Sequence, residues 1–272
     1  MRIGISNLAW DPAEDEAIAA ILRQLDIDAI DIAPGKYFQL DSVPTASEIA
    51  RVRQQWQDRG IAITGMQALL FGTRDLNLFG TVQQQSDMLQ HLQRVCIVGA
   101  RLGATRLVFG SPRNRDRNGL DDAQAITIAT EFFSRLGDIA AREGVLICLE
   151  PNPRIYGANF LIDSVETASL VACIGQPSIR MQLDTGAIAA NGEECSRIVR
   201  DFGTLIGHIH ASEPGLATLG DGSCDHAVMA AAIRQSLPDH IVCIEMLASA
   251  KEPHAQAVER AIRMVQRHYG AD

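Results

Sequence analysis

The sequence between residues 145 and 212 contains three short apolar runs: VLICLEP (145–151), IRMQLDTG (179–186) and LIGHIHAS (205–212). Each run ends in or just before polar residues, and the intervals between the runs are long enough to hold a helix. Short apolar runs that alternate with longer helical segments are typical of repeated β-strand and α-helix units, and not of β-sandwiches or helical bundles. This segment therefore predicts three consecutive parallel strands.

The same alternation continues on both sides of this segment. Five further apolar runs predict strands at residues 2–7, 29–34, 63–69, 106–110 and 240–246. Helices are predicted from after the first strand to residue 23 and at residues 46–58, 81–102, 123–142 and 253–269. Gly60 and Gly103 lie just after two of these helices, where glycine is the preferred terminating residue.

The number of predicted units decides between two architectures. Eight strands, each followed by a helix, favour a closed (β/α)8 TIM barrel. An open, doubly wound sheet would need a glycine-rich phosphate turn after an early strand, and the sequence has no such motif. A length of 272 residues suits one barrel, so a single domain is predicted over residues 1–272.

Composition limits the classes of partner. The net charge of −9 argues against a nucleic acid partner, because binding to phosphate backbones requires a basic surface. No apolar run reaches the length needed to cross a membrane, and the opening MRIGISNLAW has no basic start or cleavage site of a secretory leader. We therefore expect a cytoplasmic protein without a membrane partner, while a homo-oligomer stays open.

Four of the predicted strands carry an ionisable side chain at or near their carboxyl ends. These residues are Glu150, Asp184, His210 and Glu245, and they are separated by 34, 26 and 35 residues, about one β/α unit each. In parallel barrels such strand ends surround the active site. A single carboxylate there can equally cap a helix or pair with an arginine, but four converging groups would repel one another without a cation.

The four residues therefore predict the ligands of one divalent metal ion. Three carboxylates and one imidazole form an oxygen-rich set, which favours Mn²⁺ or Mg²⁺ and leaves Co²⁺ and Zn²⁺ open. His208 alternates with Ile209 and should also point into the barrel, one layer deeper than His210. We expect His208 to support the ligands or the core, whereas His91, His254 and His268 fall on helical stretches and are expected at the surface.

The motifs LEPNP with Glu150, QLDTG with Asp184, GHIHASE with His210 and Glu213, and IEM with Glu245 resemble the sugar isomerase/epimerase superfamily with the xylose-isomerase-like barrel. The resemblance spans essentially the whole chain and is nearest in layout to the ketose 3-epimerases. It implies that the four matching side chains hold the metal and that Glu150 and Glu245 exchange protons with a substrate carbon. The expected function is a metal-dependent isomerase or epimerase of a carbohydrate or polyol derivative, acting through an enediolate.

Three positions depart from the pattern of this family. Tyr156, Ala187 and Leu216 stand where the ketose 3-epimerases carry a glutamate, a histidine and an arginine that anchor the substrate. An ordinary free ketohexose is therefore not the expected substrate. Other residues that follow strands are candidates for substrate binding: Lys36, Gln67, Arg113, Asn152 and Glu213.

The charge of the substrate stays open at this stage. Arg115 and Arg154 also follow strands, and several cations at the barrel mouth would suit an anionic sugar acid or sugar phosphate. Solvated loop residues are an equally good account of both arginines.

Other functions are compatible with the same residues. A dehydratase of a keto-polyol would begin with the same proton abstraction and end with loss of a hydroxyl group. A noncatalytic sugar-binding barrel could keep the metal without exchanging substrate hydrogen. A phosphodiesterase fits less well, because such barrels gather a larger set of histidines and carboxylates for several metals.

Overall fold

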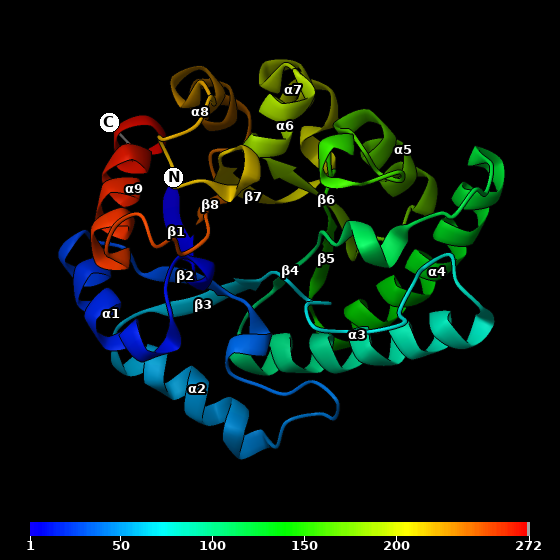
Figure 1. Cartoon of the computed structure of the whole chain (residues 1–272), viewed down its shortest axis with the longest axis horizontal. Coiled ribbons are helices and arrows are strands. Elements are labelled where there is room, and N and C mark those ends of the chain that lie inside the picture. The colour runs from blue at the N-terminus through cyan, green and yellow to red at the C-terminus, as the bar shows by residue number, and fades with distance from the viewer. Residues whose placement is uncertain (271–272) are drawn as a thin grey trace.

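The computed structural model describes residues 1–270, and the strands in this part of the chain form a closed parallel barrel in the order β1 to β8 (Figure 1). The barrel closes because β1 pairs with both β2 and β8. Closure leaves no unpaired sheet edge. The predicted (β/α)8 fold is thereby confirmed. The last two positions of the predicted domain range, Ala271 and Asp272, lie outside the described residues.

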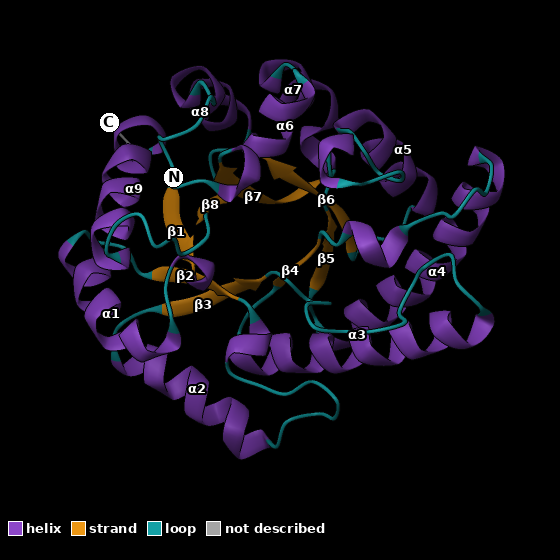
Figure 2. Ribbon diagram, in the orientation of Figure 1, coloured by secondary structure: helices purple, strands orange, loops and turns teal. Residues whose placement is uncertain are grey.

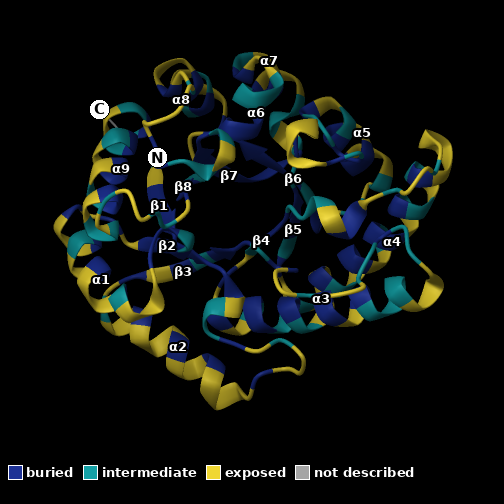
Figure 3. Cartoon of the chain, viewed as in Figure 1, coloured by how far each residue is buried: buried dark blue, intermediate teal, exposed yellow. Residues whose placement is uncertain are grey.

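Each predicted strand corresponds to an observed one. The strands are β1 (Arg2–Ser6), β2 (Ala29–Ile32), β3 (Ala62–Met66), β4 (Arg106–Phe109), β5 (Leu146–Leu149), β6 (Ile179–Asp184), β7 (Ile206–Ser212) and β8 (Ile241–Glu245). Most residues of these strands are buried, and the strands appear dark blue at the centre of Figure 3. Near-continuous apolar runs are expected for parallel strands that are covered on both faces.

The helices form a ring around the barrel (Figure 2). They are α1 (Asp15–Gln24), α2 (Ala46–Asp58), α3 (Val82–Leu102), α4 (Asp122–Glu143), α5 (Ser164–Ile174), α6 (Thr185–Asn191), α7 (Cys195–Phe202), α8 (His226–Ser236) and α9 (His254–Tyr269). The starts of α2 and α3 are fixed by capping boxes at Thr45 and Thr81. Gly103 ends α3 in the left-handed conformation, with a φ of 91°, as its position in the sequence predicted.

Two features differ from the sequence-based expectation. The connection from β6 to β7 holds two helices, α6 and α7, because Gly192 adopts a φ of 65° and ends the first after seven residues. His91 on α3 was expected at the surface but is buried, and its Nε2 lies 2.8 Å from the carbonyl oxygen of Leu69. The loop after β3 packs over this face of α3, which the helical period alone does not reveal.

Polar side chains interrupt the apolar interior of the barrel at a few positions. His208 and His210 on β7 and Asp31 on β2 are all buried among apolar residues. Charged and polar groups are rarely buried without partners, so these three side chains indicate a polar site inside the barrel. None of the helices within residues 1–270 combines the length and apolar character that a bilayer crossing requires.

Candidate metal centre

The four predicted metal ligands come together at the carboxyl end of the barrel. Glu150 directly follows β5, Asp184 ends β6, His210 lies on β7 and Glu245 ends β8. One ligand atom from each of them lies within 4.8 Å of the others. The strand register accounts for this convergence, because Asp184 pairs with His210 across β6 and β7, and β8 continues the sheet beside them.

The electrostatics of this group fit a divalent cation. Burial, together with Glu245 and Asp184, raises the pKa of Glu150 to about 8. Burial and Glu245 likewise raise the pKa of Asp184 to about 6. Burial alone would lower the pKa of His210, but the neighbouring carboxylates raise it well above its ordinary value. Without a cation the group must therefore retain protons, whereas a divalent ion would balance the carboxylate charge.

The orientation of His210 indicates which nitrogen faces the other ligands. Nδ1 lies 3.1 Å from Oε2 of Glu245 and 3.8 Å from Oε1 of Glu150. Nε2 points the other way, toward Oδ2 of Asp31 at 3.7 Å. Nδ1 is therefore the imidazole nitrogen available to a metal held by the carboxylates.

Hydrogen bonds fix the two carboxylates that precede His210 in the chain. Asp184 Oδ1 accepts from the backbone N–H of Ala187 and so caps α6, and Asp184 Oδ2 accepts from Ser212 Oγ, both at 2.7 Å. Glu150 Oε2 accepts from Asn152 Nδ2 at 3.0 Å. Each of these oxygens keeps a further lone pair, so the carboxylates can still ligate a cation.

A cavity of about 420 Å³ opens over the three carboxylate ligands, with His210 buried behind them. This volume is within the range of small-molecule sites. The cavity lining includes Glu150, Asp184 and Glu245, and also Tyr156, Ala187 and Leu216, the positions at which the sequence departs from the ketose 3-epimerase pattern. Much of the remaining wall is apolar: Leu8, Ala68, Leu69, Leu70, Phe71, Val108, Phe109 and Pro112.

Three of the five predicted substrate-binding residues line this cavity, namely Gln67, Asn152 and Glu213. Gln67 is buried, its Nε2 donates to Ser6 Oγ, and its Oε1 has no hydrogen-bond partner among residues 1–270. Glu213 accepts from the backbone N–H groups of Gly220 and Cys224, and therefore holds the loop before α8 in place.

The other two predicted substrate-binding residues lie outside the cavity lining. Lys36 turns back toward the loop after β1, where its Nζ donates to the carbonyl oxygens of Asn7 and Trp10. Arg113 is exposed on the loop after β4. In both cases the loop conformation, which the sequence pattern does not specify, sets the direction of the side chain.

Sequence reasoning missed one residue of this region and misjudged another. Asp31 lies beside His208, whose Nε2 is 2.6 Å from Asp31 Oδ2, so the predicted supporting role of His208 involves a partner on β2. The one sequence signal for Asp31 was an acidic residue inside the apolar run AIDIAP. Arg115 was interpreted as a loop residue at the mouth, but it is buried and donates to the carbonyl oxygen of Glu150 and to Asn152 Oδ1.

Burial alone would raise the pKa of Asp31, but His208 and His210 together hold it well below its ordinary range. The carboxylate of Asp31 is therefore ionised inside the barrel. An ionised carboxylate can only accept hydrogen bonds, which suits its position between two imidazole rings.

Comparison with known proteins agrees with this geometry. A model of the xylose isomerase-like TIM barrel family matches residues 19–268. The chain belongs to this family. Its structural neighbours include a D-psicose 3-epimerase solved in the presence of D-fructose. That structure has a TM-score of 0.82 and 19% identity, with 100% of both chains covered.

Two further relatives are similar to the chain, one at lower identity and the other over a smaller part of the chain than the D-psicose 3-epimerase. The 3-keto-D-glucoside 4-epimerase of E. coli has a TM-score of 0.78 and 17% identity, with 98% of this chain and 99% of that chain covered. The L-ribulose 3-epimerase of Methylomonas sp. (strain DH-1) is 30% identical over 103 residues, a match that covers 38% of this chain and 36% of the relative. The two structural likenesses show that the chain shares the fold of these sugar epimerases.

Proposed function

We propose that this protein is a metal-dependent epimerase or isomerase of a carbohydrate or polyol derivative. The observation that carries the proposal is the pair Glu150 and Glu245, which follow β5 and β8 and meet beside His210 at the floor of the cavity. Two carboxylates on either side of a bound substrate can remove a proton from one face of a carbon and return it to the other. The 3-epimerases and the 4-epimerase among the structural neighbours support the same class of reaction.

The cation would be held by Glu150, Asp184, His210 and Glu245. When bound, a divalent ion supplies positive charge that polarises a carbonyl group and makes the neighbouring C–H more acidic. An oxygen-rich set favours Mn²⁺ or Mg²⁺, with Co²⁺ and Zn²⁺ as less suited alternatives.

The two glutamates perform the proton transfer. One carboxylate accepts the proton from the substrate carbon, and the electron pair of the C–H bond moves onto the carbonyl oxygen to give an enediolate. The protonated form of the other glutamate then donates a proton to the opposite face of that carbon, which inverts its configuration. Delivery to the neighbouring carbon, together with transfer of the hydroxyl proton on that carbon to the former carbonyl oxygen, would give isomerisation instead. Asn152, held by Arg115, donates to Glu150 and keeps its carboxylate directed at the cavity.

We infer a neutral substrate with an apolar portion. Among the residues that the structure describes, no lysine or arginine lines the cavity, which argues against the sugar acid or sugar phosphate that the sequence suggested. Leu69, Phe71 and Leu216 offer an apolar wall to a ring face or a substituent. Gln67 lines the same cavity and offers a polar group to a substrate hydroxyl group.

A dehydratase of a keto-polyol is the second candidate function, and Tyr156 favours it. The phenol oxygen of Tyr156 accepts from the backbone N–H of Gly215 at 2.8 Å, so the phenol proton is free to be donated into the cavity. A proton donor beside the substrate would assist departure of a hydroxyl group after the first proton abstraction. Product analysis separates the two reactions, because dehydration changes the mass of the substrate and epimerisation does not.

Hydrogen exchange at substrate carbon tests the proposal. Protein loaded with Mn²⁺ in deuterated water would be presented with neutral ketoses, keto sugars that carry an apolar substituent, sugar acids and sugar phosphates. NMR would follow uptake of deuterium at carbon. We expect uptake with a neutral substrate and its loss in both Glu150→Gln and Glu245→Gln. Glu131→Gln on the exposed face of α4 is the matched control.

Two results would contradict the proposal. A wild-type protein that binds Mn²⁺ but exchanges no hydrogen with any compound of the panel would favour a sugar-binding role. Uptake that persists in both glutamate variants would assign the proton transfer to other residues.

A further inference from the structure

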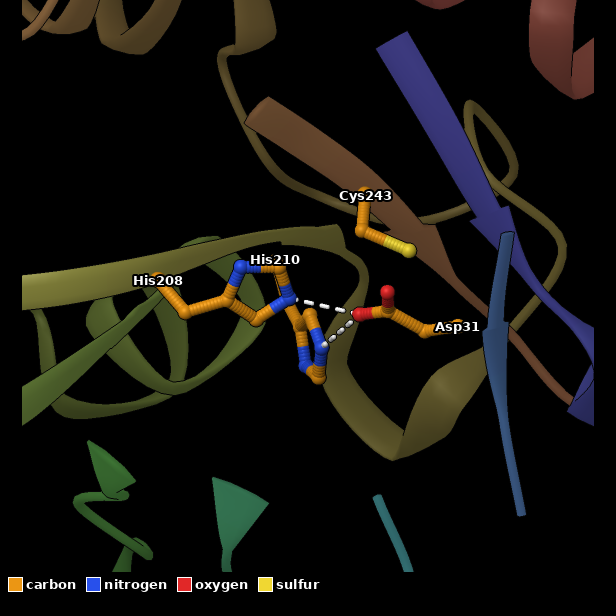
Figure 4. Close-up of side chains that lie close together, drawn as sticks. All are labelled: Asp31, His208, His210 and Cys243. Atoms are coloured by element: carbon orange, nitrogen blue, oxygen red, sulfur yellow. Dashed lines mark hydrogen bonds and ion pairs between the residues drawn. The ribbon is translucent and has the colours of Figure 1, made fainter. Parts of the chain in front are cut away.

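A second buried cluster lies directly beneath the candidate metal centre. Asp31 on β2, His208 and His210 on β7, and Cys243 on β8 direct their side chains toward one another inside the barrel (Figure 4). Asp31 is fully buried, and its Oδ2 lies 2.6 Å from His208 Nε2 and 3.7 Å from His210 Nε2. Its Oδ1 accepts from Thr64 Oγ1 at 3.0 Å. His210 therefore belongs to both clusters, one through each ring nitrogen.

The two ring nitrogens of His210 must be in different protonation states when a metal is bound. A neutral imidazole carries one N–H, and a nitrogen that ligates a metal must present a lone pair. Because Nδ1 faces Glu150 and Glu245, metal binding there requires the proton to be on Nε2. Nε2 is buried and has no hydrogen-bond partner within the described chain, and the carboxylate that it faces belongs to Asp31.

We propose that Asp31 is a positioning residue of the metal centre. It accepts the Nε2–H of His210, fixes the tautomer and direction of the ring, and so leaves the Nδ1 lone pair for the cation. A distance of 3.7 Å is too long for a hydrogen bond, so a movement of well under 1 Å completes the contact. Such support commonly orients metal-bound histidines, and hydrogen bonds of this kind often tighten only when the site is occupied. The inference rests on the metal site of the proposed function.

The backbone around Asp31 is shaped to hold this carboxylate. A Cβ at Gly65 on the neighbouring strand would lie 2.5 Å from Asp31 Oδ1, so glycine is the residue that leaves room for the side chain. The register of β2 and β3 shifts between Ile30 and Asp31, next to this contact. Thr64 and His208 then hold the carboxylate from two sides. These contacts indicate that the buried carboxylate of Asp31 has a specific role in the site.

A second metal ion in this cluster is the competing interpretation. Asp31, His208, His210 and Cys243 form a donor set that Zn²⁺ accepts. However, His208 Nε2 and Asp31 Oδ2 are only 2.6 Å apart and form a direct hydrogen bond. Two ligands of a tetrahedral zinc ion, each about 2.0 Å from the metal, would lie roughly 3.3 Å apart. The geometry therefore favours the hydrogen-bonded network.

The substitution Asp31→Asn tests the proposal, because it keeps the shape of the side chain and removes its charge. Isothermal titration calorimetry would measure the Kd of Mn²⁺ for the metal-free protein. We expect affinity to fall about 10- to 100-fold, as for other partners of metal-bound histidines. Asp15→Asn is the matched control, because Asp15 is also buried and accepts from Trp10 and Tyr37, yet lies outside the cavity lining and both clusters.

A second readout reports on the ring itself. Nitrogen–proton correlation spectra of the Mg²⁺-loaded protein should show the His210 Nε2–H proton shifted downfield by a hydrogen bond to the Asp31 carboxylate in the wild type, and less so in Asp31→Asn. If Asp31→Asn does not fold, Thr64→Val decides the question, because it removes one hydrogen bond to Asp31 and should weaken Mn²⁺ binding severalfold.

The outcomes separate this inference from the proposed function. A folded Asp31→Asn protein with the wild-type Kd and an unchanged chemical shift of the His210 Nε2–H proton would overturn the role of Asp31 alone. Two metal ions per chain by elemental analysis, with one lost in Cys243→Ser, would replace it with a second metal site. A wild-type protein that binds no divalent cation would overturn the metal centre and this inference together.

Discussion

Gly110 and Glu150 approach each other so closely that a Cβ at position 110 would lie 2.0 Å from Glu150 Oε2. Gly110 follows β4 and Glu150 follows the neighbouring strand β5, and both residues line the cavity. The space that permits the glutamate to reach the other ligands is therefore provided by the missing side chain of its neighbour.

The substitution Gly110→Ala is expected to displace Glu150 and to lower both Mn²⁺ affinity and substrate hydrogen exchange by at least about tenfold, because misplaced ligands and bases lose most of their effect. Calorimetry and the deuterium assay would measure these two losses. Gly35→Ala is the matched control, since no heavy atom of the described residues lies within 4 Å of a Cβ there. Full activity in Gly110→Ala would show that Glu150 does not need its observed position.

Removal of metal is expected to destabilise the protein. A ligand present at 100 times its Kd stabilises the folded state by about 2.7 kcal/mol, which for a chain of this size corresponds to a change in Tm on the order of 5 to 10 °C. Differential scanning fluorimetry with EDTA, and again after addition of Mn²⁺, would measure the change. The double variant Glu150→Gln, Glu245→Gln should show almost no dependence on Mn²⁺, and a dependence equal to that of the wild type would place the cation elsewhere.

The stability of the metal-free protein is expected to fall as pH rises. The pKa of Glu150 is raised from 4.5 to about 8 by burial and by Glu245 and Asp184, so the folded protein retains a proton that the unfolded chain releases. Stability from this group is complete below about pH 4.5 and is lost as pH rises through about 8. Urea unfolding in EDTA between pH 6 and pH 9 should show a loss on the order of 3 kcal/mol. Glu150→Gln should flatten the profile, and an unchanged slope in this variant would assign the effect to other groups.

Arg115 is expected to matter more than Arg113, although both follow β4. Arg115→Met removes the donor to the Glu150 carbonyl oxygen and to Asn152, and should lower kcat at least about tenfold by releasing Asn152 from Glu150. Steady-state kinetics at fixed Mn²⁺ would measure kcat and KM separately. Arg113→Met is the comparison and should leave both unchanged, whereas a raised KM would mean that Arg113 does reach the substrate, as its place in the sequence first suggested.

The sequence by itself determined the barrel and the metal-ligand candidates. Short apolar runs and helical intervals specify β/α units because burial on both faces demands continuous apolar strands. In such a barrel the carboxyl ends of all strands meet, so polar residues that end consecutive strands must converge, as Glu150, Asp184, His210 and Glu245 do. Strand alternation also predicted that His208 and His210 both point into the barrel, and both are buried on β7.

Only the tertiary structure decided which other polar groups lie beside the four metal-ligand candidates. Asp31 meets His208 across 177 residues of sequence, a contact that depends on barrel closure and register and leaves no local periodic signal. Lys36, Arg113 and Arg115 all follow strands, yet Lys36 turns to backbone carbonyl oxygens, Arg113 to solvent and Arg115 into the interior. Side-chain direction in loops follows from local backbone conformation and packing, and neither is encoded by a repeating pattern of apolar residues.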